Sequence, residues 1–79
     1  MARRDIVVEL MEESSRGVLV SLMTCPSKFL FFLRKDHPRF DAVLAILKAS
    51  LEQRTEADLV MDGYSIEDAV LTGRRWDMR

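Results

Sequence analysis

The sequence contains few of the cysteine and histidine residues on which disulfide-stabilised folds and metal sites depend. Among its 79 residues there is one cysteine, Cys25, and one histidine, His37. A single cysteine cannot form an intrachain disulfide, which excludes a disulfide-stapled secreted scaffold and favours a reducing compartment. One thiol and one imidazole cannot supply a tetrahedral zinc set, and in separate loops they do not indicate a nucleophile with its base. We therefore expect a protein that is not an enzyme and that holds no metal or cofactor.

An excess of one charge sign and long apolar runs are also missing. The 12 Lys and Arg residues are balanced by 13 Asp and Glu residues, for a net charge of −1, so the basic excess typical of a nucleic-acid binder is absent from the whole chain. Glu9 interrupts the first apolar run before it reaches the length of a signal peptide, and no run is long enough to span a membrane. We expect a cytoplasmic protein with no membrane partner.

The sequence does contain a series of apolar runs separated by turn-prone residues. Its 48% hydrophobic and 32% charged residues are typical of one ordinary globular domain. Alternation with a period of two predicts five strands, over residues 5–11, 17–23, 28–34, 56–62 and 65–71. The last run also fits a capped helical turn that begins with Glu67 and Asp68, and we favour the strand.

One helix is predicted between the third and fourth strands, over residues 39–53. Apolar residues recur there at intervals of three and four, which places them on one stripe: Phe40, Leu44, Leu47 and Leu51. Asp36 or His37 is expected to cap the helix, and Pro38 suits its first turn because the N–H that proline lacks would be unpaired there. The helix is therefore expected to pack one side against the rest of the protein and to expose the other side to water.

The first three predicted strands carry apolar side chains on both faces. One face lines the core, and the single helix covers only part of the other. Surplus apolar surface in a small domain is typical of a protein with a partner subunit; a strongly curled sheet that turns more side chains inward is the alternative. We expect a homo-oligomer whose subunit-contact face includes Val7, Met11, Leu19, Met23 and Phe32.

The order of three strands, a helix and two strands resembles that of the OB-fold, a small, partly open Greek-key barrel. The resemblance covers about residues 5–71 and implies an α+β protein, mainly β with one helix, built as a five-stranded OB-like barrel. We assign residues 1–71 to this single domain. Residues 72–79 have no periodic pattern and are expected to form a mobile tail, as chain ends usually do. Small OB-type barrels that assemble into rings, as bacterial toxin B subunits do, are also similar over residues 17–31, 44–49 and 66–69. The likeness implies no role for an individual residue.

These features predict a small protein-interaction or structural module that oligomerises. The alternative is an OB-type protein that binds single-stranded nucleic acid by stacking bases beside cations, on a face formed by Lys28, Phe31, Arg34 and Lys35. The C-terminal residues combine cations with an aromatic ring and suit an anchor to a subunit, another protein or a phosphate: Arg74, Arg75 and Trp76. The acidic residues near the last turn lack the spacing of a calcium loop and are interpreted as a solvated surface: Asp58, Asp62, Glu67 and Asp68.

Overall fold

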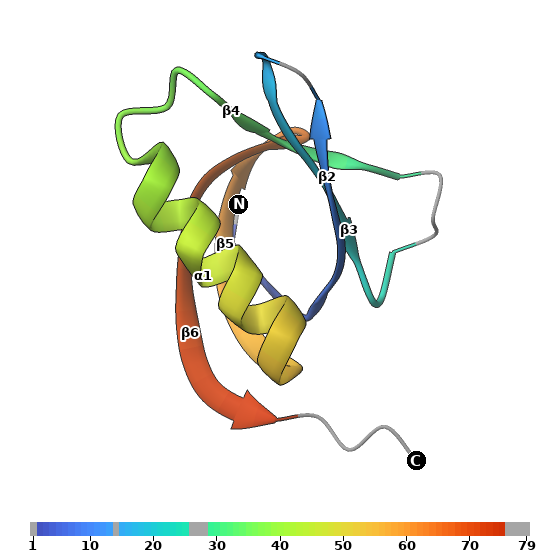
Figure 1. Cartoon of the computed structure of the whole chain (residues 1–79). Helices are drawn as coiled ribbons and strands as arrows, with labels where there is room; N and C mark the ends of the chain where they lie inside the picture. Colours follow the sequence, from blue (N-terminus) through green and yellow to red (C-terminus); the bar gives the residue numbers. More distant parts are fainter. Residues whose placement is uncertain (1, 14, 26–28, 76–79) are drawn as a thin grey trace.

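The computed structural model describes residues 2–13, 15–25 and 29–75. Within these ranges the protein is mainly β with a single helix, as predicted, but it has six strands instead of five (Figure 1). No helix in the described ranges is long and apolar enough to cross a membrane. The elements are β1 (Ala2–Asp5), β2 (Val7–Glu13), β3 (Gly17–Leu22), β4 (Phe31–Arg34), α1 (Phe40–Gln53), β5 (Thr55–Asp62) and β6 (Ser65–Arg75).

The strands form one open sheet in the order β1-β5-β6-β4-β3-β2. Neighbouring strands are antiparallel, except that β4 and β6 are parallel. The two edge strands, β1 and β2, are consecutive in the sequence and are separated by Ile6. The structure therefore has an open sheet of six strands where a five-stranded, OB-like barrel was expected.

The additional strand arises because the run predicted over residues 5–11 pairs with two different neighbours. Its first residue belongs to β1, which pairs with β5, whereas the residues from Val7 onward pair with β3. At the break, the Asp5 carboxylate accepts the N–H of Ile6 at 2.8 Å, and the Ile6 carbonyl accepts the N–H of Met23 at 2.9 Å. A side chain that satisfies a backbone donor competes with the ladder, so the chain changes partners at Ile6.

A β-bulge in β2 turns Val7 into the core. Val7 is opposite Leu22, but two residues later Glu9 is opposite Ser21, so β2 has one more residue than β3 over this stretch. An inserted residue moves the following side chains to the other face. Val7 is 1% exposed and Val8 is 43% exposed. Val7 therefore belongs to the core and not to the expected subunit-contact face.

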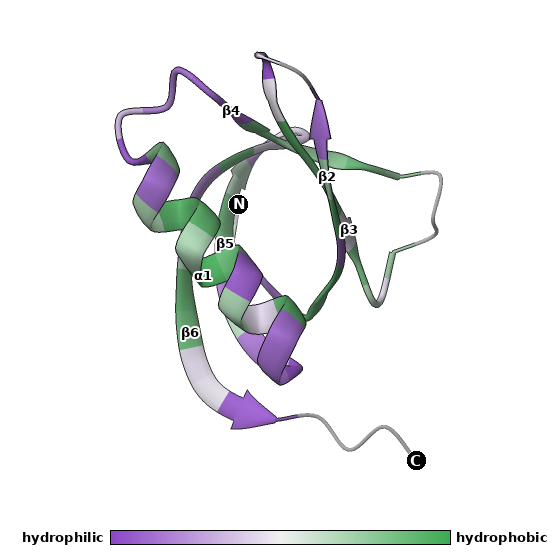
Figure 2. Ribbon diagram, in the orientation of Figure 1, coloured by the Kyte–Doolittle hydropathy of each residue, from purple (hydrophilic) through white to green (hydrophobic). Residues whose placement is uncertain are grey.

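The core lies between the sheet and α1. The helix contacts β2, β4, β5 and β6, and it lies between β6 and β2 in Figure 1. Figure 2 shows apolar and polar residues alternating along α1, as expected for a helix that buries one side. The buried residues of α1 are Val43, Leu47 and Ser50. Those of β3 to β6 that are apolar are Val18, Val20, Leu22, Phe31, Leu33, Ala57, Leu59, Met61, Ile66 and Ala69.

The helix covers the predicted residues 39–53 except the first. No side chain caps its N-terminus, so neither Asp36 nor His37 has the predicted capping role. After its last turn, Arg54 has a left-handed φ of 52° and donates its N–H to the carbonyl of Ser50. A residue in this conformation ends a helix even where no glycine is present.

The lengths of β4 and β6 differ from the prediction. Residues 65–71 form a strand and not a helical turn, and β6 continues to Arg75, which is opposite Thr55. Residues 72–75, expected to begin the tail, therefore belong to β6, while Trp76 lies outside the described residues. β4 begins at Phe31, and Lys28 also lies outside the described residues.

Candidate interaction surface

Apolar side chains from three adjacent strands form a row on the outer face of the sheet, and we call Met11, Leu19 and Phe32 the outer row. Met11 is opposite Leu19, and Leu19 is opposite Phe32, so they share one face. Their neighbours Val20 and Leu33 are buried on the other face. Met11 is 49% exposed, and Leu19 and Phe32 are half-buried. The structure therefore brings together three of the five residues predicted for a subunit contact.

Gly17 allows Phe32 to lie close against β3. A Cβ atom at Gly17 would be 2.1 Å from the carbonyl oxygen of Leu33 and 2.9 Å from Cζ of Phe32. The φ of Gly17 is +152°, which a residue with a side chain rarely adopts. A glycine is therefore required where the aromatic ring crosses the strand.

Charged residues flank the outer row with opposite signs at its two ends. Glu9 and Glu13 lie two residues before and after Met11 on β2, which places them on the same face. At the other end, Arg34 follows Phe32 by two residues on β4. All three charged residues are exposed. The outer row thus has an acidic side and a basic side.

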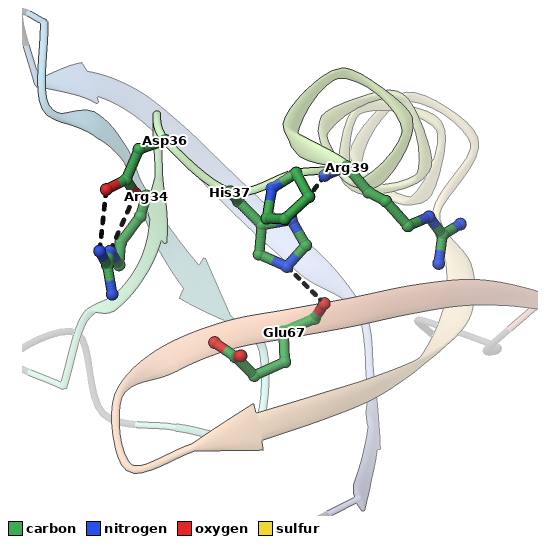
Figure 3. A pocket seen from close by; sticks show the side chains of 6 residues that line it. Arg34, Asp36, His37, Arg39 and Glu67 are labelled. Carbon is green, nitrogen blue, oxygen red and sulfur yellow. Dashed lines mark hydrogen bonds and ion pairs between the residues drawn. The ribbon is translucent and has the colours of Figure 1, made fainter.

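The basic side is partly neutralised by Asp36. Arg34 donates to both carboxylate oxygens of Asp36, from Nε at 3.0 Å and from Nη2 at 2.9 Å (Figure 3). These hydrogen bonds are the largest cause of the lowered pKa of Asp36 and of the raised pKa of Arg34. The two side chains are 61% and 70% exposed, so water screens their attraction.

His37 joins the loop before α1 to β6. Its Nδ1 accepts the N–H of Arg39 at 2.9 Å, and its Nε2 lies 2.7 Å from the carbonyl oxygen of Glu67 (Figure 3). Because Nδ1 is an acceptor, the proton lies on Nε2, which donates to Glu67. These side chains line a cavity of about 330 Å³. Both ring nitrogens are occupied, so the arrangement holds the loop in place and leaves no imidazole nitrogen for a substrate.

The predicted nucleic-acid face is divided between the core and the surface. Phe31 is 8% exposed, and its ring centre is 5.8 Å from that of Tyr64. Lys35 is exposed, and its Nζ lies 5.4 Å from the ring centre of Phe40. Phe31 therefore does not share a surface with Lys35 and Arg34.

Arg16 was not among the predicted residues, but it lies beside two that were. The N–H of Lys35 donates to the carbonyl of Arg16 at 2.8 Å, which holds the β2–β3 turn against the end of β4. Arg16, Phe32, Arg34 and Lys35 line a cavity of about 430 Å³. The sequence gives no local signal for this cluster, because it depends on strand pairing.

Two buried carboxylates, of Asp5 and Glu56, were also not predicted. Asp5 accepts hydrogen bonds from the hydroxyl and the N–H of Thr24 and from Nε of Arg3 at 3.2 Å. Glu56 accepts the hydroxyl of Thr72 at 2.9 Å. Buried carboxylates with several donors stabilise local structure, so Asp5 ties β1 to the chain after β3, and Glu56 ties β5 to β6.

Met23, the fifth predicted contact residue, lies apart from the outer row. It is half-buried and lines a different cavity together with Val7 and Leu51 of α1. In the described part of the chain, no group of three or more His, Cys, Asp or Glu side chains is placed to hold a metal ion. Comparisons with models of protein families, with curated proteins and with solved structures find no match.

Proposed function

We propose that this protein is a non-enzymatic interaction or structural module that assembles with copies of itself through the outer row. The observation that carries the proposal is the register of Met11, Leu19 and Phe32 on the face away from the core. The helix packs on the core side, so it does not cover this row. Apolar side chains gathered on an exposed sheet face favour association because their burial removes apolar surface from water.

The charges beside the outer row favour a second copy as the partner. A two-fold axis near Leu19 would set the basic side of one copy, with Arg34, against the acidic side of the other, with Glu9 and Glu13. Such an isologous contact is self-complementary, and opposite charges at its rim favour the correct orientation. The apolar row would then form the centre of the contact and the charges its rim.

An OB-like architecture is consistent with this proposal. If β1 and β2 are counted as two parts of one bent strand, the sheet has five strands. The first part of that bent strand then pairs with β5, and the second part pairs with β3. This arrangement suits a small, partly open Greek-key barrel. In such barrels the second and third strands carry the binding face, and here the equivalent strands, β3 and β4, carry Leu19 and Phe32.

The first test is the mass of the protein in solution, measured by light scattering on a size-exclusion column at low and high salt. We expect a discrete oligomer that persists at high salt, because apolar contacts are not screened by ions. Met11→Glu and Leu19→Glu should each reduce the mass to that of a monomer. Val70→Glu is the matched control, because Val70 is 57% exposed and lies on β6, outside the outer row. A wild-type monomer at every concentration would refute the proposal.

A second candidate function, the binding of single-stranded nucleic acid, is favoured by one observation. Arg16, Arg34 and Lys35 surround one cavity together with the ring of Phe32, and cations beside an aromatic ring suit a phosphate with a stacked base. Retention of a labelled single-stranded oligonucleotide should then weaken steeply with salt. Arg16→Ala should weaken it further, whereas Arg54→Ala, outside this cluster, should not. Retention that is absent at low salt would exclude this function.

A further inference from the structure

The cavity between the β2–β3 turn and the end of β4 concentrates positive charge, although the whole chain has a net charge of −1. Its volume of about 430 Å³ falls within the range of about 300–1,000 Å³ typical of small-molecule sites. Three cations and one carboxylate line it, so its formal charge is +2. We call it the basic cavity, and its lining residues are Ser15, Arg16, Phe32, Arg34, Lys35 and Asp36.

Two of the three cations are available to an anion. Among the described residues, Arg16 and Lys35 have no carboxylate within ion-pair distance, and both are exposed. The backbone holds them together, because the N–H of Lys35 donates to the carbonyl of Arg16 at 2.8 Å. Arg34, in contrast, already donates from Nε and Nη2 to Asp36 (Figure 3). An anion in the basic cavity would therefore meet two cations first and a third that a carboxylate neutralises.

The charge of the basic cavity matches a phosphate monoester better than a phosphate diester. A monoester carries about −1.5 to −2 charges at pH 7, whereas the diesters of a nucleic-acid backbone carry about one negative charge each. A guanidinium binds phosphate through two parallel hydrogen bonds, and an ammonium group binds it as a point charge. The ring of Phe32 in the lining suits an apolar or aromatic body on the same ligand.

We propose that the basic cavity binds a small organic phosphate monoester and that this ligand weakens the self-assembly proposed above. The second part rests on that proposed function, because Phe32 belongs to the outer row and Arg34 to its basic side, and both also line the basic cavity. The ligand would cover Phe32 and neutralise the charge that attracts the acidic side of a second copy. By thermodynamic linkage, assembly and ligand binding then weaken each other by the same factor.

Titration of the isotope-labelled, full-length protein with phenyl phosphate, followed by NMR, tests the site. We expect saturable shifts of the amide signals of residues 15–17 and 32–36, and weaker binding of inorganic phosphate, which has no ring. Arg16→Ala should weaken the binding of phenyl phosphate roughly tenfold, because a charged hydrogen bond is lost. Arg54→Ala, at an exposed arginine outside the cavity, should leave it unchanged. Shifts that do not saturate, or equal effects of the two variants, would overturn the site.

Asp36 provides a test in the opposite direction. Asp36→Asn removes a carboxylate from the lining and releases the donors of Arg34, so it should tighten the binding of phenyl phosphate severalfold. Asp62→Asn makes the same change of charge at an exposed residue that ends β5, and it should have no such effect. Weaker binding in Asp36→Asn would contradict the site. Binding of a single-stranded oligonucleotide without any binding of phenyl phosphate would replace the monoester with a nucleic acid.

Light scattering on a size-exclusion column, with and without saturating phenyl phosphate, tests the coupling to self-assembly. The mass of the wild type should fall toward that of a monomer, whereas sodium benzoate at the same ionic strength should leave it unchanged. Arg16→Ala, which lies outside the outer row, should keep its mass at the same concentration of phenyl phosphate. A wild-type oligomer that persists with the cavity saturated would overturn the coupling and leave self-assembly intact. A wild-type monomer without ligand would refute self-assembly and the coupling together, and the titration would still decide the site.

Discussion

The hydroxyl oxygen of Ser50, on α1, accepts the backbone N–H of Val7, on β2, at 3.1 Å. The same hydroxyl donates to the carbonyl of Thr55 at 2.7 Å. Ser50 is fully buried, so water cannot replace it at either partner. One side chain therefore joins the edge strand β2 to the helix and to the start of β5, although Val7 and Ser50 are 43 positions apart in the sequence.

Replacing Ser50 with alanine should destabilise the protein by roughly 1–3 kcal/mol, because a buried donor and a buried acceptor both lose their partner. Urea unfolding followed by circular dichroism measures the change. Ser65→Ala is the control, since Ser65 bonds the exposed Glu67 at 3.1 Å, and its effect should stay within about 0.5 kcal/mol. Similar losses in both variants would contradict the role given to Ser50.

Replacing Gly17 with alanine should destabilise the protein by about 3 kcal/mol or more, because the added Cβ meets the Leu33 carbonyl and the Phe32 ring and the backbone is also strained. Gly63→Ala should cost about 1 kcal/mol, because Gly63 has a φ of +63° but open space around it. The two losses are compared through the midpoints of thermal unfolding of Gly17→Ala and Gly63→Ala, each measured against the wild type. A smaller loss at Gly17 than at Gly63 would show that the close approach of Phe32 does not constrain β3.

Replacing Asp5 with alanine should cost about 3 kcal/mol, because the N–H groups of Ile6 and Thr24 lose their shared acceptor in a buried site. Asp5→Asn keeps one acceptor oxygen and should cost about half as much. Arg3→Ala removes the partly exposed member of the ion pair and should cost no more than about 1 kcal/mol. The free energy of unfolding, measured with a chemical denaturant, should therefore fall most in Asp5→Ala, less in Asp5→Asn and least in Arg3→Ala. A larger loss of stability in Arg3→Ala than in either Asp5 variant would contradict this assignment.

The Arg34–Asp36 pair should make a small, pH-dependent contribution to stability. The folded-state pKa of Asp36 lies below its ordinary value of 3.8, so the contribution is fully present above that value and is lost as the pH falls through the folded-state pKa. The raised pKa of Arg34 adds no change in this range. The difference in unfolding midpoint between the wild type and Asp36→Asn should therefore shrink as the pH falls from 7 to 3. If the difference between the two midpoints grew as the pH fell, the ion pair would not stabilise the protein in the way assigned to it.

The elements that depend on local periodicity were predictable, and those that depend on a distant partner were not. The helix follows from its apolar stripe, and most strands follow from alternation. β1 has no alternating apolar pattern and exists because it pairs with β5. The bulge at Val8 is also invisible in the sequence, since it is defined by the register with β3, and it moved Val7 from the predicted contact face into the core.

The residues of the candidate surface also separate into those that local periodicity predicts and those that depend on a distant partner. Met11, Leu19 and Phe32 were predicted because the period of two holds from the bulge onward, and their alignment across three strands follows from the pairing. Arg16 was missed because only the tertiary contact of its turn with Lys35 places it beside Arg34. Phe31 was assigned to a binding face although Leu33, on the same side of β4, is a core residue.

The position of β1 at the far edge of the sheet also affects how the chain reaches its fold. Ala2 is opposite Val60, so this ladder forms only when the start of the chain meets a segment more than 50 residues further along it. Loop closure over such a distance has a high entropic cost, and folds rich in non-local pairings fold slowly. The β2–β3 hairpin needs a much shorter closure. Folding is therefore expected to proceed from the hairpin toward β1, and until β1 docks, the edge of β5 remains available to other chains.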